Sequence, residues 1–121
     1  MWIKQIIKYY EGDVEADVIV TDGRFELMCY ALYCENNVGD VDFTLTPFDC
    51  GDVMTSEVNE YRIQKLESGY YDYKLQGKLI AVEKDVGTVQ IGGIIISGVR
   101  CIPKDICVGE YVEFTVIRLE L

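Results

Sequence analysis

Apolar and polar residues alternate along much of the chain, and this pattern predicts β-strands. The alternation is clearest from residue 14 onward, where one face of the first run is apolar and carries Val14, Ala16, Val18 and Val20. Asp22-Gly23 follows, a pair typical of a two-residue type I′ turn, so we predict a β-hairpin over residues 14–34. One face of the return strand carries Phe25, Leu27, Cys29, Ala31 and Tyr33. The other face carries Met28, Tyr30 and Leu32. Both faces are apolar, which predicts that this strand is covered on both sides.

Residues 2–10 at the N-terminus fit two patterns. Ile3 and Ile6 have helical spacing, whereas Ile3, Ile7 and Tyr9 share one face of a strand. The segment is rich in isoleucine and aromatic residues, which favour strands. We therefore predict a strand.

The middle of the chain contains a strand followed by its least periodic segment. Val41, Phe43 and Leu45 alternate with polar residues and predict a strand that ends at Pro47. Residues 48–60 have no clear period and are expected to form a loop or crossover. The one place that suits a short helix follows Thr55 or Ser56, whose hydroxyl would cap the helix N-terminus.

A second hairpin is predicted between residues 60 and 77. Tyr61 and Ile63 alternate with polar residues on its first strand, and the turn over residues 67–69 contains a glycine. The return strand is expected to begin at Tyr70.

The apolar face changes partway along two long strands. On the strand from Tyr70 it shifts past Gly77 to Ile80 and Val82, which predicts a bulge or bend at this glycine. The last strand has two successive apolar sets: Val112, Phe114 and Val116, then Ile117, Leu119 and Leu121. Long strands with such shifts are typical of closed, strongly coiled barrels.

Residues 77–121 predict a meander of three strands, over 78–82, 88–99 and 111–121. A turn at Lys84-Asp85 joins the first two. Gly92-Gly93 fits either the turn of a tight hairpin or a kink in one continuous strand. We favour the kink, because residues 94–96 would otherwise form a very short arm.

These patterns predict an all-β fold. The length of 121 residues suits one domain, residues 1–121, built as a small barrel or curved sandwich of about six to eight strands with at most one short helix.

Three features of the C-terminal half carry a resemblance to a known class. They are Gly77 within a long strand, the run 88–96, and Val108-Gly109-Glu110-Tyr111-Val112 at the start of the last strand. In these features about a third of the chain resembles an OB-type barrel, the class that includes cold-shock and related RNA-binding domains. The resemblance implies an OB-like barrel that binds single-stranded nucleic acid or a small ligand, with exposed aromatic residues as contacts.

The charge of the chain points away from nucleic acid. Eleven basic residues stand against 21 acidic ones, which gives a formal net charge of −10. Such a surface repels phosphate backbones and anionic lipid and is attractive to a basic partner. It also serves simply to keep a protein in solution.

The residue types present predict a protein that is not an enzyme. There is no histidine, so neither a Ser/His/Asp triad nor a Cys/His pair can be built, and strand acids such as Glu15 and Asp17 are expected to be solvated. The cysteines are odd in number and lack zinc-site spacing: Cys29, Cys34, Cys50, Cys101 and Cys107. We expect no catalytic residues, no metal and no cofactor. The chain has no signal-peptide pattern and no apolar run of membrane-spanning length, so a cytoplasmic location is expected.

The best candidate for an interaction surface is Tyr70, Tyr71 and Tyr73, because tyrosine combines a large contact area with a polar tip. The competing interpretation places Tyr71 and Tyr73 in the core and Tyr70 at a turn. The leading functional hypothesis is an acidic interaction module that binds another protein, basic in character, through a sheet edge or these tyrosines. The alternatives are the OB-like ligand binder and an acidic decoy that competes for a basic nucleic-acid-binding site.

Overall fold

The computed structural model describes residues 1–32, 39–40 and 44–121, and all regular structure within them is β-strand. The predicted all-β fold class is confirmed. The strands are β1 (Trp2–Lys8), β2 (Glu15–Thr21), β3 (Glu26–Leu32), β4 (Gly39–Asp40), β5 (Thr46–Cys50), β6 (Met54–Thr55), β7 (Arg62–Lys65), β8 (Tyr73–Glu83), β9 (Val86–Ile91), β10 (Ile94–Val99) and β11 (Tyr111–Glu120). They outnumber the expected six to eight because β4 and β6 have two residues each and one predicted strand divides into β9 and β10.

The helix considered after Thr55 or Ser56 does not form. The Ser56 hydroxyl donates to the Val58 carbonyl and accepts from the Val58 N–H, so it closes a tight turn instead of capping a helix. The described residues contain no helix that is long and apolar enough to cross a membrane.

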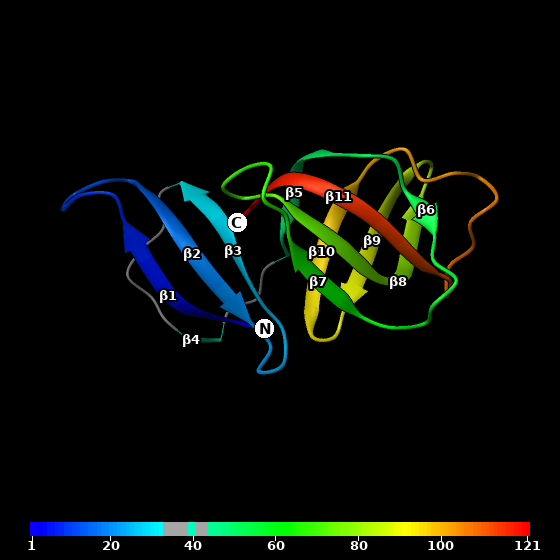
Figure 1. Cartoon of the computed structure of the whole chain (residues 1–121), viewed down its shortest axis with the longest axis horizontal. Coiled ribbons are helices and arrows are strands. Elements are labelled where there is room, and N and C mark those ends of the chain that lie inside the picture. Colours follow the sequence, from blue (N-terminus) through cyan, green and yellow to red (C-terminus); the bar gives the residue numbers. More distant parts are fainter. Residues whose placement is uncertain (33–38, 41–43) are drawn as a thin grey trace.

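β8 and β11 are the central strands of the sheet (Figure 1). One edge of β8 pairs with β7 and then with β9, and its other edge pairs with β11, antiparallel in every case. β11 also pairs with β5 and β6 and reaches β3 through a parallel contact between Glu120 and Tyr30. β11 therefore joins the N-terminal strands to the C-terminal ones.

The C-terminal strands curl until the sheet meets itself, which confirms the predicted barrel-like shape (Figure 1). Leu45, which directly precedes β5, forms a parallel bridge with Ile96 in β10. The Leu45 N–H donates to the Ile95 carbonyl at 3.0 Å, and its carbonyl accepts from the Ser97 N–H at 2.8 Å. Because β5 also pairs with β11, the strands β5, β11, β8, β9 and β10 follow one another around a ring.

The strand predicted to end at Pro47 has a different boundary. β5 begins at Thr46 and continues through Pro47 to Cys50, with Pro47 opposite Leu119 at an irregular point of the β5–β11 ladder. A proline is tolerated there because such a position does not need its N–H. The predicted strand residues 41–43 lie outside the described residues.

β1 forms as predicted, but its inward face is not the predicted one. The register shifts between Ile3 and Gln5, so Ile3 is buried and Ile6 packs against the core, while Ile7 and Tyr9 are exposed. The i, i+3 spacing that resembled a helix is thus produced by a β-bulge.

The first hairpin forms, but its turn is displaced from the predicted position. Thr21 pairs with Glu26 and the Asp22 N–H donates to the Phe25 carbonyl at 3.3 Å, so the turn is centred on Gly23 and Arg24 instead of Asp22-Gly23. The Asp22 carboxylate accepts the N–H groups of Arg24 at 2.9 Å and Phe25 at 2.7 Å and so organises this loop.

The two faces of β3 differ, which corrects the prediction that both are covered. Leu27, Cys29 and Ala31 are buried, whereas on the other face Met28 and Tyr30 are half-buried and Leu32, at the end of the strand, is exposed. Only one side of β3 therefore faces the core, and Tyr33 lies outside the described residues.

Gly77 remains on the inward face of β8, and the shift in register comes later, at Ile80. A Cβ at Gly77 would lie 2.7 Å from Ile91 Cγ1 and closer still to the Gln90 carbonyl, so this position requires glycine for close packing. Ile80 and Val82 are exposed instead of inward-facing, and Leu79 is the buried residue. The predicted bend at Gly77 is therefore wrong in its position.

Gly92-Gly93 is the turn of a hairpin, not the kink that we favoured. Ile91 pairs with Ile94, and Gly92 has a φ of 59°. The Gly93 N–H donates to Asp22 Oδ2 at 2.6 Å, so the carboxylate that organises the β2–β3 loop also holds this turn.

β11 shows the predicted change of inward face, one step later than expected. Val116 and Leu119 are buried, whereas Ile117 is exposed. One hydrophobic core runs through both parts of the sheet, and its largest fully buried side chains are Phe114, Leu27, Leu45, Leu75, Leu79, Ile91, Ile94, Ile96 and Leu119.

Asp22→Asn should destabilise the protein by about 1–3 kcal/mol at neutral pH, because the carboxylate accepts three backbone N–H groups. Partial burial alone would raise the pKa of Asp22, but the bonds from Phe25, Gly93 and Arg24 outweigh it and hold the pKa below the usual 3.8. The carboxylate's contribution is thus complete above the unfolded pKa and is lost as the pH falls through the lower folded pKa. Urea unfolding of both proteins should show the difference shrinking in acid. A constant difference, or an equal loss in the exposed-site control Asp105→Asn, would contradict this role.

Candidate interaction surface

Tyr73, one of the three predicted surface tyrosines, belongs to the core. It is the first residue of β8 and only 7% exposed. Its hydroxyl accepts the Met28 N–H at 2.8 Å, so the one polar atom of the buried ring has a partner. The competing interpretation is therefore correct for this residue.

Tyr70 and Tyr71 lie in the loop between β7 and β8, because β8 begins three residues later than predicted. This loop is closed by a bond from the Leu66 N–H to the Asp72 carbonyl at 3.0 Å and by the Ser68 hydroxyl on Asp72. The rings of Tyr70 and Tyr71 meet edge to face at 4.7 Å. The loop thus holds both rings in fixed positions.

Three tyrosine hydroxyls converge on the side chain of Asp17 in β2. Tyr71 donates to Oδ1 at 2.5 Å, Tyr9 donates to the same oxygen at 3.0 Å, and Tyr70 donates to Oδ2 at 2.9 Å. The Tyr9 and Tyr71 hydroxyls are also 2.7 Å apart. Asp17 is only 3% exposed, so the expectation that this strand acid is solvated was wrong. The three hydroxyls provide the hydrogen bonds that a buried carboxyl group requires.

The pKa values of these tyrosines reflect the same arrangement. Burial, followed by the bonds to Asp17 and Tyr9, raises the pKa of Tyr71 far above its usual range. The bond to Asp17 raises the pKa of Tyr70, and burial raises the pKa of Tyr9. All three hydroxyls therefore keep their protons at any physiological pH, and the cluster stays intact.

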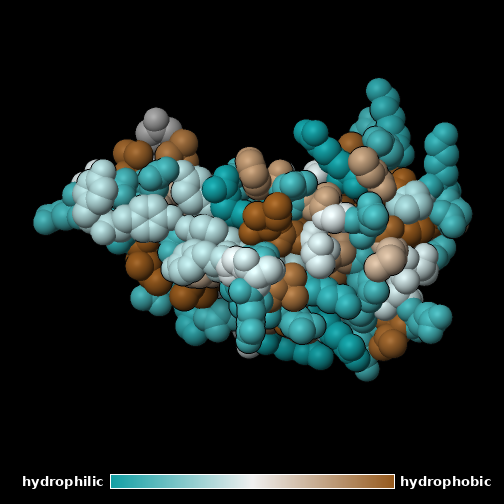
Figure 2. Space-filling view, turned by 45° about the horizontal axis from the view of Figure 1, so that its top comes forward, coloured by the Kyte–Doolittle hydropathy of each residue, from teal (hydrophilic) through white to brown (hydrophobic). Residues whose placement is uncertain are grey.

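The bonds to Asp17 leave much of the aromatic surface open to solvent. Tyr9 is 48% exposed, its neighbour in the sequence, Tyr10, is 69% exposed, and Tyr70 is 61% exposed. We call these residues and Tyr71 the tyrosine surface. Figure 2 shows side chains of intermediate hydropathy gathered at the end of the molecule that carries the β1–β2 turn. Sequence reasoning found Tyr70 and Tyr71 but missed Tyr9, Tyr10 and Asp17; the aromatic pair next to the turn Glu11–Asp13 was the available signal.

A second aromatic cluster lies where β11 meets β3 and β5. The Arg118 guanidinium stacks on the rings of Tyr30, at 4.6 Å, and Phe48, at 4.5 Å, and it also pairs with Glu120. The Tyr30 hydroxyl donates to Glu15 at 2.6 Å, and this bond raises the pKa of Tyr30 to about 12. This cluster already contains its own cation, so it is less open to a cationic ligand than the tyrosine surface.

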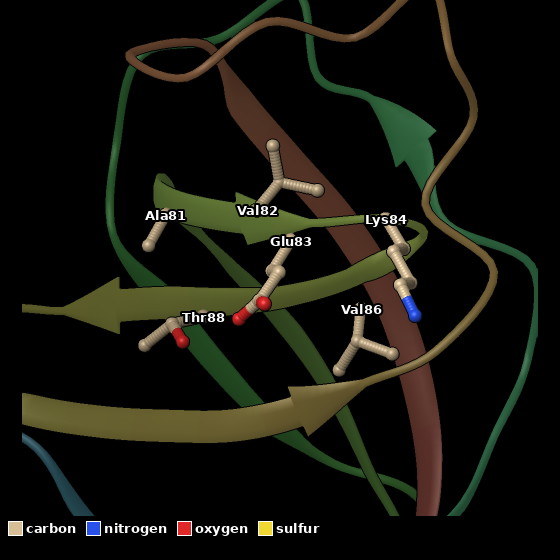
Figure 3. A pocket seen from close by; sticks show the side chains of 6 residues that line it. All are labelled: Ala81, Val82, Glu83, Lys84, Val86 and Thr88. Atoms are coloured by element: carbon tan, nitrogen blue, oxygen red, sulfur yellow. The ribbon is translucent and has the colours of Figure 1, made fainter.

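A shallow pocket at the tip of the β8–β9 hairpin is a weaker candidate site. It is lined by Ala81, Val82, Glu83, Lys84, Val86 and Thr88 (Figure 3). Its one acidic and one basic side chain lie among small apolar ones, with no convergent set of polar groups. No three Asp, Glu or Cys side chains in the described part of the chain are grouped so as to hold a metal ion.

Comparison of the chain with protein-family models, with curated proteins and with solved structures gives no match.

Tyr71→Phe should destabilise the protein by about 1–3 kcal/mol, because it removes the hydroxyl that bonds both Asp17 and Tyr9. Tyr10→Phe is the matched control, since its hydroxyl has no hydrogen bond in the described structure, and it should change stability by less than about 0.5 kcal/mol. Urea unfolding at neutral pH measures both. Equal effects of the two substitutions would show that the Asp17 network contributes nothing specific.

The raised tyrosine pKa values predict a loss of stability in alkali. The protonated hydroxyls are favoured in the folded state, so their contribution is complete below the unfolded tyrosine pKa near 10 and is lost as the pH rises above it. Between pH 8 and 11 the free energy of unfolding should therefore fall more steeply for the natural protein than for Tyr71→Phe. Parallel curves would rule out Tyr71 as a group linked to folding.

Proposed function

We propose that the protein is a non-enzymatic interaction module that binds a basic segment of a partner protein at the tyrosine surface. The observation that carries this proposal is the convergence of Tyr9, Tyr70 and Tyr71 on the buried Asp17. Because the hydroxyls are hydrogen-bonded to the buried Asp17 carboxylate, the rings are held in place before a partner binds. Pre-organised aromatic side chains lose little conformational entropy on binding and therefore make efficient contacts.

The charge of the molecule favours a basic partner. With a net charge of −10, the protein attracts a segment rich in lysine or arginine at long range. At short range, the face of a tyrosine ring attracts a guanidinium or ammonium group, by about 0.5–1 kcal/mol at an exposed site. Several such contacts are needed for useful affinity, and Tyr9, Tyr10 and Tyr70 offer three exposed rings.

The resemblance to an OB barrel supplies the second candidate function. Five strands in a ring that closes through one bridge are compatible with that class. OB barrels bind single-stranded nucleic acid on the face of their second and third strands, to which β9 and β10 would correspond. The partly exposed, outward residues there are Thr88, Gln90, Ile95 and Ser97. They provide no ring for base stacking, and we therefore rank nucleic-acid binding below protein binding.

Affinity capture from lysate with matched variants tests the proposal. The double variant Tyr10→Ala/Tyr70→Ala removes two exposed rings, and Met54→Ala/Val108→Ala removes two other apolar side chains that are 55% exposed each. We expect to capture proteins that bind both the natural protein and the Met54/Val108 variant and that elute with salt. The captured amount of these proteins should be about tenfold lower on the tyrosine variant.

Two results would contradict the proposal. Capture that is equal on the tyrosine variant would place the interaction elsewhere. Capture of nucleic acid instead of protein would favour the OB-like function.

A further inference from the structure

The ring of strands is incomplete on one side, between β5 and β10. In the part of the chain that the structure describes, the one ladder contact here is the parallel bridge between Leu45, which precedes β5, and Ile96. Beyond it lies a cleft of about 500 Å³. Its lining comes from β5 and the segment after it, from the start of β9, and from the end of β10 with the two residues that follow it. It includes Phe48, Asp49, Cys50, Asp52, Arg100 and Cys101. We call this cleft the seam.

The sequence explains why pairing stops at the seam. In a parallel ladder, the bonds from the Leu45 N–H to the Ile95 carbonyl and from the Ser97 N–H to the Leu45 carbonyl would be followed by one from the N–H of residue 47 to the Ser97 carbonyl. Residue 47 is proline, which has no N–H. The Ser97 carbonyl therefore lacks the donor that a continued ladder would supply.

A bulge in β10 separates the two strands further. The register of β10 against β9 shifts between Ile96 and Val99, and Gly98 within this bulge has a φ of 72°. Such bulges bend a strand and end its pairing. Gly98 still lies against Thr46 at the start of β5, where a Cβ on the glycine would be 3.2 Å from Thr46 Cγ2. Beyond that point no bridge joins the described residues of β5 to β10, and the two strands face a cleft.

We propose that the seam binds an extended, basic segment of a partner protein as an added strand between β5 and β10. The volume lies within the range of about 300–1,000 Å³ that is typical of ligand sites. The main chain of the segment would donate to the Ser97 carbonyl, at the end of the cleft next to the lining residue Gly98, as in other cases of strand addition. Its basic side chains would face Asp49 and Asp52, which outnumber the single basic residue of the lining, Arg100. This site is separate from the tyrosine surface and does not depend on the function proposed for it.

Two cysteines provide an internal assay for the seam. Cys101 and Cys107 are both exposed, but only Cys101 lines the cleft. A bound segment should protect Cys101 from the neutral reagent iodoacetamide and leave Cys107 unprotected. The probe is the peptide acetyl-Val-Arg-Val-Arg-Val-amide, which alternates apolar and basic side chains and has no terminal charges. Mass spectrometry measures the labelling rate of each cysteine.

We expect half-maximal protection of Cys101 below about 1 mM peptide, and about tenfold slower labelling at ten times that half-protection concentration. The rate at Cys107 should not change. The same peptide N-methylated at both arginines keeps its charge but loses two N–H donors, and it should not protect. Equal protection by the methylated peptide, parallel changes at both cysteines, or no protection at 1 mM would overturn the proposal.

Charge-matched variants test the role of the two acids. Asp49→Asn/Asp52→Asn should raise the half-protection concentration about tenfold, the effect of two partly exposed ion pairs. Glu57→Gln/Asp105→Asn removes the same charge from exposed sites outside the cleft and should have little effect. An equal effect of the two double substitutions would mean that only net charge matters, and would overturn the proposed contact with Asp49 and Asp52.

Tyr10→Ala/Tyr70→Ala should leave Cys101 protection unchanged, so the two proposals can be tested independently.

Discussion

The pairing of β11 is the constraint on which the rest of this structure depends. One edge of the strand is bonded to β8, Val112 and Glu113 also pair with β6, and further along the strand contacts β5 and β3. Its inward residues Val112, Phe114, Val116 and Leu119 are all buried in the shared core. Because the strand changes its inward face between Val116 and Leu119, it can pack first against the ring and then against the N-terminal strands. Without that change, one of the two parts would have no apolar partner on this strand.

Two aspartates in the N-terminal part of the chain then tie it to the C-terminal strands through polar contacts. Asp22 accepts a hydrogen bond from the Gly93 N–H at the turn between β9 and β10. Asp17 accepts hydrogen bonds from tyrosine hydroxyls of the loop between β7 and β8. Both contacts span more than 50 residues of sequence, and both use a carboxyl group that is wholly or partly shielded from water. Polar contacts of this kind fix geometry as well as contributing stability, since a misplaced strand would leave a shielded carboxyl group without donors. The tyrosine surface is therefore a consequence of how the two parts of the fold are joined.

The sequence predicted the strands wherever alternation was local, and it failed where a distant contact decided the outcome. The β2 and β3 strands and the turn at Lys84-Asp85 follow from periodicity and turn residues alone. The burial of Asp17 depends on tyrosines that are 53 and 54 residues away, and no local pattern reports such a contact. Likewise, Gly92-Gly93 looked like a kink because the short arm after it seemed unsupported, whereas β10 is supported by Leu45 from the other side of the ring. Bulges moved the inward face in β1 and β8, and a bulge has no reliable signature in a single sequence.

An open seam carries a risk of self-association, and the composition of this protein reduces it. Unpaired strand edges attract other edges, including those of further copies of the same chain. Here Pro47 removes one donor, the bulge at Gly98 interrupts the regular edge of β10, and Asp49, Asp52 and Arg100 place charges at the cleft. The net charge of −10 makes the approach of two copies unfavourable, but it favours the approach of a basic segment. The charge that protects the seam from other copies of the chain is therefore the charge that would select the basic segment proposed to bind there.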